Sequence, residues 1–459
     1  MQKLIAKYGA AAHLALLAAA PLFLFPFSQA DVIATALLWL SLPAAVWTFM
    51  EPSVLDGEML HNARVRVIRA MTTDPLFWAC LVLVAFAGIR ALNSGIGLSY
   101  DAEKAVWFVS SARFPLFPGS VGFDGYLPFS TAVAATVLIQ GCRHSLGRSA
   151  RMAMLLVSSS LAGAAAVIAL VFLGSSNEVV KAGMACAYPM CSFVGLAFAL
   201  HFFGGLVALV SAFERGWNLT MPFFSLAVGG TAAGAFVFSP APVSFAVGVC
   251  GVALVAYAFL YTCRNLRATG EFKFLVVCGI ALTLGGLMAV AFMPEKLLQE
   301  RLAPYLTFEF RPERLREIRA LLTGVAIKSW LEHIWVGTGV GSFPLDFRFA
   351  ATPENWSQLS SREVPMFNGW CLLLVERGIV GAVAVLLPFG FLAFTYFRRL
   401  VEGLGRLALP HPATFLAPLS AVLLGLTGAY DCSVLRADVM MAAVVFLAIS
   451  ASSFLRKKR

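Results

Sequence analysis

The sequence predicts an all-α, polytopic integral membrane protein with about 12 transmembrane helices. The first observation behind this is the composition: of 459 residues, 60% are hydrophobic and 13% charged, and the mean hydropathy is +0.83. Such a chain has too little polar surface to fold as a soluble globule. The second is the recurrence of apolar windows of about 20 residues, the length that crosses a bilayer core of roughly 30 Å. The third is a single long polar interruption between two apolar regions.

The apolar windows and the interruption divide the chain into three parts. Residues 1–293 hold nine spans, residues 294–370 form a large loop, and residues 371–459 hold three more spans and a basic tail. Glycine and alanine in the segment 229–234 suit close packing between spans, because small residues let backbones approach. The candidate spans are 9–28, 32–50, 75–93, 126–141, 152–173, 191–212, 219–238, 243–262, 274–293, 371–396, 413–430 and 438–455.

The distribution of lysine and arginine predicts the orientation. Basic residues gather in alternate short loops, which by the positive-inside rule face the cytoplasm. Both termini are then cytoplasmic, and the loop 294–370 faces outward between helices 9 and 10. The net charge of +10 is mainly this topology signal, so membrane lipids are expected partners and nucleic acid is not. The basic loop residues include Lys3, Lys7, Arg64, Arg66, Arg69, Arg143, Arg148, Arg151, Arg215, Arg264, Arg267, Lys273, Arg398, Arg399 and Arg406.

Two features of the spans have alternative interpretations. The N-terminal layout ending in Ser28-Gln29-Ala30 resembles a cleavable signal peptide, although an uncleaved first helix preserves the charge alternation better. His13 and His201 lie within predicted spans. A histidine there is either a functional group or a packed, hydrogen-bonded core residue, and the second interpretation is favoured.

The outward loop contains a predicted amphipathic helix over residues 311–333. Leu322, Val325 and Trp330 belong to its apolar stripe. Arg316 and Arg319 share another face, which suits a phosphate because guanidinium groups bind phosphate oxygens with two parallel hydrogen bonds. The alternative is a solvated face with local ion pairs.

Glycines and an asparagine mark the rest of the loop. The run Gly337-Thr338-Gly339-Val340-Gly341 allows a tight backbone path, either as a plain turn or as a close approach to a ligand. Residues 351–369 are polar and are expected to cover the site. Asn368 then leads into the tenth span, which carries Glu376 and Gly378 near its start.

The residues between Arg319 and Gly381 resemble the signature region of the O-antigen ligase and polymerase family. The resemblance includes the large loop between spans nine and ten, and it implies about twelve spans in the bacterial inner membrane. The residues that carry it are Arg319, Trp330, Gly337, Gly339, Gly341, Phe343, Asn368, Leu374, Glu376, Gly378 and Gly381.

This resemblance implies an inverting glycosyltransferase that uses no metal and no cofactor. The donor would be a polyprenyl-pyrophosphate-linked glycan, and the acceptor a sugar hydroxyl of a lipid or growing glycan at the periplasmic face. Arg319 would hold the pyrophosphate, while Glu376 and Gly378 would shape the start of span ten. Arg316, Gly339, Gly341, Asn368 and Glu376 are the expected substrate-binding residues.

Two positions depart from the family pattern. Phe367 stands where the family places a histidine before the asparagine, and a phenyl ring accepts no proton. Pro240 stands where a second arginine is expected. Glu363 and His333 are therefore the candidate bases, and Lys181, Arg113 and Arg348 the candidate cations. The other interpretations are a catalytically silent relative that binds the lipid-linked glycan or an assembly partner, and a transporter.

Overall fold

The computed structural model describes much of the apolar part of the chain and part of the loop 294–370. The described residues are 15–16, 19, 22, 68, 72–92, 98–101, 106–109, 126–144, 148–173, 192–214, 221–239, 241–265, 269–292, 299, 313–339, 343, 368–404, 409–430, 443–444 and 446–451. The predicted spans 9–28 and 32–50 lie almost entirely outside these residues.

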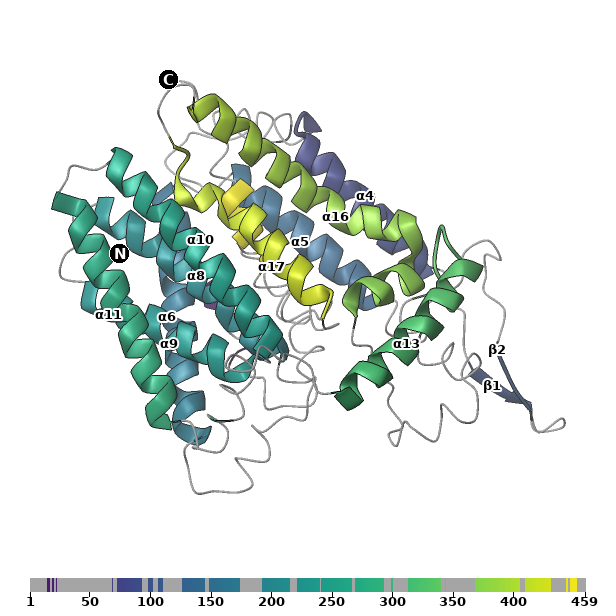
Figure 1. The fold of residues 1–459 in the computed structure, drawn as a ribbon. Coiled ribbons are helices and arrows are strands. Elements are labelled where there is room, and N and C mark those ends of the chain that lie inside the picture. Colours follow the sequence, from purple (N-terminus) through teal and green to yellow (C-terminus); the bar gives the residue numbers. More distant parts are fainter. Residues whose placement is uncertain are drawn as a thin grey trace.

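Helices make up nearly all of the described structure (Figure 1). Their bounds agree with the predicted apolar windows between residues 75 and 430, because each window is long enough to satisfy its own backbone hydrogen bonds in lipid. The ends of the predicted span 438–455 lie outside the described residues. They are α4 (Pro75–Leu92), α5 (Tyr126–His144), α6 (Arg148–Leu173), α8 (Ser192–Glu214), α9 (Met221–Phe238), α10 (Ala241–Asn265), α11 (Thr269–Phe292), α13 (Glu313–Glu332), α16 (Gly369–Leu404), the 3₁₀ turn η3 (Pro412–Thr414) and α17 (Leu416–Gly428).

The chain is a membrane protein. Four of the described helices are long and apolar enough to cross a bilayer: α6, α8, α10 and α16. Shorter apolar helices occupy most of α4, α9, α11 and α17. Large hydrophobic side chains such as Val252, Phe394 and Leu287 are exposed on this surface, as expected for side chains that face lipid.

One element was not predicted. Strands β1 (Leu98–Asp101) and β2 (Val106–Val109) pair antiparallel between α4 and α5, with Leu98 opposite Val109 and Asp101 opposite Val106. The alternating pattern of these short segments is too brief to distinguish a strand from a loop. The described structure is therefore helical with one small β-hairpin.

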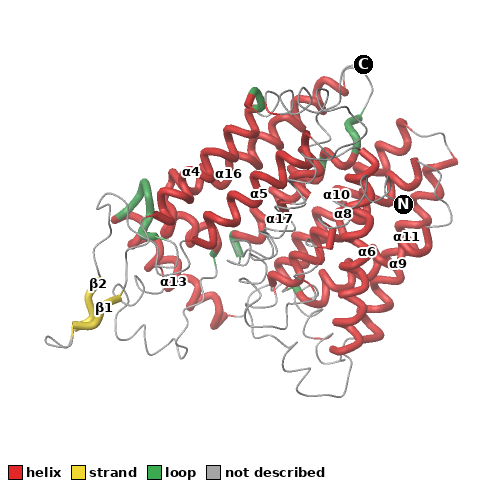
Figure 2. Tube along the Cα trace, turned by 180° about the vertical axis from the view of Figure 1, so that it is seen from behind, coloured by secondary structure: helices red, strands yellow, loops and turns green. Residues whose placement is uncertain are grey.

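The helices form two groups that Figures 1 and 2 show from opposite sides. In the first group, α8 lies at the centre and packs against α6, α9 and α10, while α11 packs on α9. The apolar length of α8 is wholly buried. The second group consists of α4, α5 and the long helix α16. Helix α17 bridges the groups by packing against both α10 and α16, and α13 packs on α16.

Small residues set the spacing of α6, α9 and α11. A Cβ added at Gly163 would lie 2.7 Å from the carbonyl oxygen of Ala227, and one at Gly229 would lie 2.5 Å from that of Ala281. A Cβ at Gly285 would lie 2.6 Å from the carbonyl oxygen of Gly229. The three helices therefore touch backbone to backbone, which confirms the close packing predicted for the segment 229–234.

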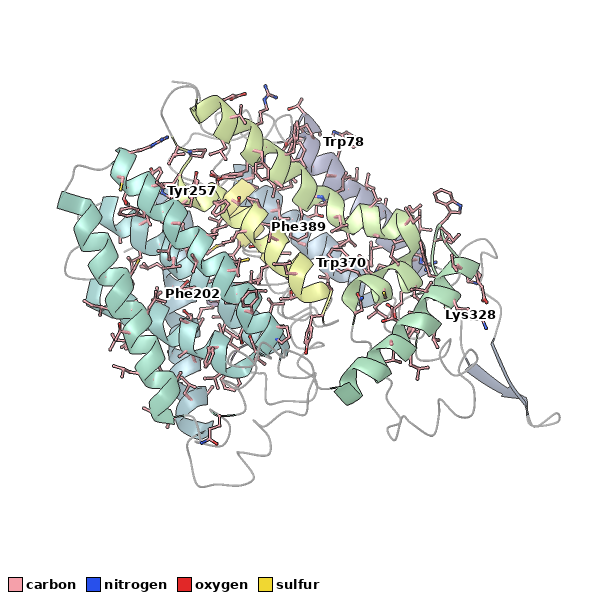
Figure 3. The ribbon with its side chains drawn as sticks, in the orientation of Figure 1. Trp78, Phe202, Tyr257, Lys328, Trp370 and Phe389 are labelled. Carbon is pink, nitrogen blue, oxygen red and sulfur yellow. The ribbon has the colours of Figure 1, made fainter. Side chains whose placement is uncertain are left out.

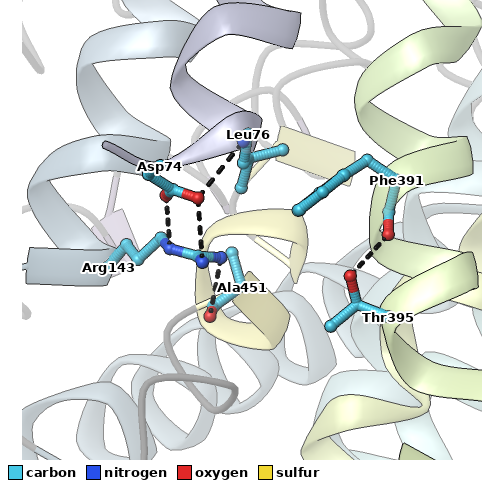
Figure 4. Close-up of polar contacts among 6 residues, drawn as sticks. All are labelled: Asp74, Leu76, Arg143, Phe391, Thr395 and Ala451. Carbon is cyan, nitrogen blue, oxygen red and sulfur yellow. Dashed lines mark hydrogen bonds and ion pairs between the residues drawn. The ribbon is translucent and has the colours of Figure 1, made fainter. Parts of the chain in front are cut away.

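A buried ion pair joins Asp74, the residue before α4, to Arg143 in the last turn of α5 (Figure 4). Nε of Arg143 lies 2.7 Å from Oδ2 of Asp74, and its Nη2 donates to Oδ1 at 3.1 Å. Oδ1 of Asp74 also accepts from the backbone N–H of Leu76 at 3.2 Å, which caps α4. Nη1 of Arg143 donates to the carbonyl of Ala451 at 3.3 Å. Arg143, which was predicted only as a topology signal, therefore binds three segments together.

His201 is a core residue of α8. Its side chain is fully buried, and its ring meets Phe446 edge-on with centroids 5.6 Å apart. The backbone carbonyl of the same residue accepts from the hydroxyl of Ser159 at 2.9 Å. This packing agrees with the favoured interpretation of a packed histidine. His13 lies outside the described residues.

Candidate functional site at the break in α16

Helix α16 consists of two segments that meet at Gly378. As one straight helix its 36 residues would extend about 54 Å, well beyond a bilayer core of roughly 30 Å. Gly378 has φ 64° and ψ −174°, a conformation that side chains disfavour. The break therefore requires glycine at this position, and it divides a short first segment from the main span.

A break of this kind removes intrahelical hydrogen bonds around it, and the loop after α13 replaces them. The backbone N–H groups of Ile379 and Val380 donate to the carbonyls of Ile334 and Trp335, each at 3.0 Å. In the other direction, the N–H of Thr338 donates to the carbonyl of Val375 at 2.7 Å. Two backbones exchange hydrogen bonds here as neighbouring strands do, so the buried polar groups stay paired.

Two further contacts complete this exchange. The N–H of Gly339 donates to the carbonyl of Glu376 at 3.0 Å, and the hydroxyl of Thr338 donates to Val375 at 3.1 Å. The segments approach so closely that a Cβ at Gly337 would lie 2.5 Å from the backbone nitrogen of Arg377. Gly337, Gly339 and Gly378 all have positive φ values. The described part of the glycine run, residues 337–339, therefore lies directly against the backbone of α16, whereas residues 340 and 341 lie outside the described residues.

A buried arginine from α4 reinforces the break. Nη2 of Arg90 donates to the carbonyl of Glu376 at 2.7 Å, and only 2% of the Arg90 residue is exposed. The Glu376 carbonyl therefore accepts from both Arg90 and Gly339. The charges of Arg90, Glu376 and Arg377 also interact electrostatically with one another. The break is thus a charged site in which Arg90 and Glu376 are buried and Arg377 is half-buried.

Replacing Arg90 by methionine should destabilise the protein by about 1.5–3 kcal/mol, the usual contribution of a hydrogen bond from a charged group. The reason is that methionine keeps the buried volume but offers no donor to the Glu376 carbonyl. We expect a lower midpoint of thermal unfolding in detergent. Arg264→Met is the matched control, because Arg264 also lies in the last turn of an apolar helix but is exposed. Equal midpoints for both variants would contradict a stabilising role for Arg90.

The start of α16 is fixed by Asn368. Its Oδ1 accepts from the N–H groups of Trp370 and Cys371 at 3.0 and 3.2 Å, the contacts of a helix N-cap. The indole N–H of Trp370 donates to the carbonyl of Gly425 in α17 at 2.9 Å. The side-chain oxygen of Asn368 therefore begins the helix, and the predicted role of this residue in binding substrate stays a prediction.

The other predicted site residues are distributed along α13 and beyond it. Arg316 and Arg319 lie in the first half of α13, which was predicted as a helix over residues 311–333 and is confirmed over Glu313–Glu332. Its predicted apolar stripe is also confirmed at Leu322 and Val325, which are buried. His333 directly follows the helix and is exposed. Gly341, Glu363, Phe367, Lys181, Arg113, Arg348 and Pro240 lie outside the described residues.

The sequence did contain a signal for the residue that was missed. Arg90 is a charged residue in an otherwise apolar span, and such residues are usually paired inside the protein. The partner was not foreseeable, because it is a backbone carbonyl 286 positions away. In the part of the chain that the structure describes, no three His, Cys, Asp or Glu side chains gather as metal ligands would.

The chain matches no protein-family model and no curated protein.

Proposed function

We propose that the protein is a glycosyltransferase of the O-antigen ligase and polymerase type, with about 12 spans in a bacterial inner membrane and both termini in the cytoplasm. It transfers a glycan from a polyprenyl-pyrophosphate carrier to a sugar hydroxyl of a lipid or growing glycan. The reaction takes place at the periplasmic face, in the assembly of surface polysaccharide or lipopolysaccharide.

One observation supports this proposal above the others. The family resemblance rests in part on Gly337, Gly339, Glu376 and Gly378, and these residues meet in space. The two segments that contain them are far apart in the sequence, since Thr338 binds Val375 across 37 positions. A chance resemblance among glycines would not require its members to contact one another. Their meeting also fixes the C-terminal end of α13, the helix that carries Arg319, against the end of a membrane span.

The chemistry requires a cation and a base. The acceptor hydroxyl oxygen attacks the anomeric carbon of the donor sugar while the bond from that carbon to the phosphate oxygen breaks. The base takes the hydroxyl proton, and the carrier leaves as a diphosphate. Arg319 supplies the charge that stabilises the leaving diphosphate. The base is His333, which is exposed at the end of α13, or Glu363.

Replacing Arg319 by alanine should lower the rate of glycan transfer by about 10²–10³-fold, the usual effect of removing a group that stabilises developing charge. The assay uses purified protein in lipid nanodiscs, a polyprenyl-pyrophosphate-linked oligosaccharide and a lipid acceptor. Lys328→Ala is the matched control, because Lys328 is a cation on the same helix that projects outward from it (Figure 3). A similar rate for both variants would reject the role of Arg319.

The same assay separates the candidate bases and the alternative function. His333→Ala and Glu363→Gln are compared, and the variant that loses activity identifies the base. If the parent protein forms no product but retains the donor in a binding assay, the protein is a silent relative, which the phenylalanine at position 367 favours. A transporter is supported less well. Broken helices do occur in transporters, but here a protein loop already binds the backbone groups around the break in α16.

A further inference from the structure

A half-open apolar groove lies between α10 and the helices α8, α9 and α11. Its volume is about 490 Å³, within the usual range of ligand sites. The buried floor includes Phe202 of α8 and Ala235 of α9, and the exposed rim includes Val252 of α10 and Leu282 of α11. Figure 3 shows Phe202 within this helix group. The open side of the groove therefore lies on the surface that faces lipid.

The lining offers no group to a polar ligand. Ser244 is the polar side chain among the described lining residues, and its hydroxyl already donates to the carbonyls of Ser239 and Phe236 at 3.2 and 3.4 Å. The remaining described lining residues are aliphatic, aromatic or glycine. At this depth in a bilayer the only abundant apolar matter is hydrocarbon chain, so the groove suits the tail of a lipid.

The length of the groove favours a lipid tail that is longer than a phospholipid acyl chain. Along α10 the lining repeats with helical spacing from Ser244 through Gly248, Gly251 and Val255 to Phe259. At 1.5 Å per residue this face is about 22 Å long, whereas one leaflet of hydrocarbon is only about 15 Å thick. A phospholipid acyl chain ends near the midplane. A longer chain is needed to fill the groove past that point.

The groove begins at the end of the molecule where the candidate site lies. Ser244 is one turn into α10, and in Figures 1 and 2 α13 lies toward the end where both α10 and α16 begin. A lipid tail seated in the groove would therefore present its head group at the same membrane face as α13.

From this geometry we infer that the groove binds the polyprenyl tail of the carrier lipid. The inference rests on the proposed function for the identity of the carrier, and on the length and lining of the groove for the binding site. The helices α8, α9, α10 and α11 then recognise the tail, and the loop 294–370 acts on the head group.

A photoactivatable polyprenyl phosphate tests this inference with the protein in lipid nanodiscs. Cross-linked peptides are mapped by mass spectrometry, and we expect labels on α10 along the groove. Gly248→Leu should reduce this labelling by about tenfold, the effect of excluding roughly two methylene groups from an apolar site. Gly248 suits the test because a Cβ at this lining residue meets nothing within 4 Å, so the leucine fills the groove and not the core.

Gly286→Leu is the matched control. Gly286 is an exposed helical glycine of α11 where a Cβ also meets nothing within 4 Å, and it is not among the lining residues. Equal labelling of both variants would overturn the inference. So would equally strong labelling of α10 by a photoactivatable phosphatidylglycerol, which would assign the groove to bulk lipid.

The transfer assay separates failure of this inference from failure of the proposed function. If the parent protein forms no product, but its α10 is labelled and Gly248→Leu reduces this labelling about tenfold, the groove is supported and the transferase is rejected. If the parent protein forms product and Gly248→Leu leaves the labelling of α10 unchanged, the transferase is supported and the groove is rejected as the binding site of the tail.

Discussion

Replacing Gly378 by alanine should destabilise the protein by at least about 3 kcal/mol, because two costs combine at one position. A residue with a side chain costs about 1–3 kcal/mol in the glycine-only backbone region that Gly378 occupies, with φ 64° and ψ −174°. The added Cβ would also collide with the backbone of Trp335 and Val336. That backbone cannot withdraw without breaking the hydrogen bonds that Ile334 and Trp335 accept from α16.

The measurement is thermal unfolding in detergent, followed by limited proteolysis of the loop after α13. We expect a lower unfolding midpoint and new cleavage near residues 333–339, because the loop would leave the break. Gly390→Ala is the control in the same helix, where a Cβ meets nothing within 4 Å. It should leave stability unchanged or raise it by up to about 1 kcal/mol. If Gly378→Ala behaves like Gly390→Ala, the docking of the loop is not required for the fold.

Removing either member of the Asp74–Arg143 pair should have an effect of similar size. Asp74→Asn or Arg143→Met leaves the partner as an uncompensated buried charge, which costs about 3–5 kcal/mol. The two side chains are only 5% and 10% exposed, so water does not replace the lost partner. Both variants should show strongly reduced unfolding midpoints and poor yields of monodisperse protein.

The double variant Asp74→Asn with Arg143→Met checks this explanation. It removes both charges, so it should be more stable than either single variant. An exposed pair provides the control. Nε of Arg398 lies 3.0 Å from Oε1 of Glu402, and the two side chains are 70% and 58% exposed. Arg398→Met should therefore change the free energy of unfolding by no more than about 0.5 kcal/mol. Additive effects in the double variant would show that the buried pair has no special coupling.

The sequence predicted the helices well because each is decided locally. A window of apolar residues satisfies its own hydrogen bonds in lipid, so the bounds of α6, α8 and α10 follow from hydropathy. The amphipathic helix α13 follows from its 3.6-residue period. The β-hairpin was missed because its strands have four residues each, too few for a period to be recognised.

Contacts between distant segments were much less predictable. The glycines at 337 and 339 indicated a tight backbone path, and Gly378 was expected to shape the start of span ten, but no local rule states that these residues meet. Arg143 was assigned to topology, although its guanidinium also binds Asp74 and the carbonyl of Ala451. Asn368 was assigned to substrate from the resemblance, while the helix cap that it forms is a common use of asparagine before a helix. Sequence spacing identifies such residues, but only the fold supplies their partners.

The packing of α6, α9 and α11 also determines how rigid the groove wall is. Because α9 touches α6 and α11 through backbone atoms at Gly163, Gly229 and Gly285, it cannot move toward either helix at these positions without displacing backbone. Ala232, Ala235 and Phe236 of the same helix therefore face the groove from a fixed position. A tail that fits this preformed shape binds without the cost of reorganising the protein, and a tail of another shape cannot induce a fit.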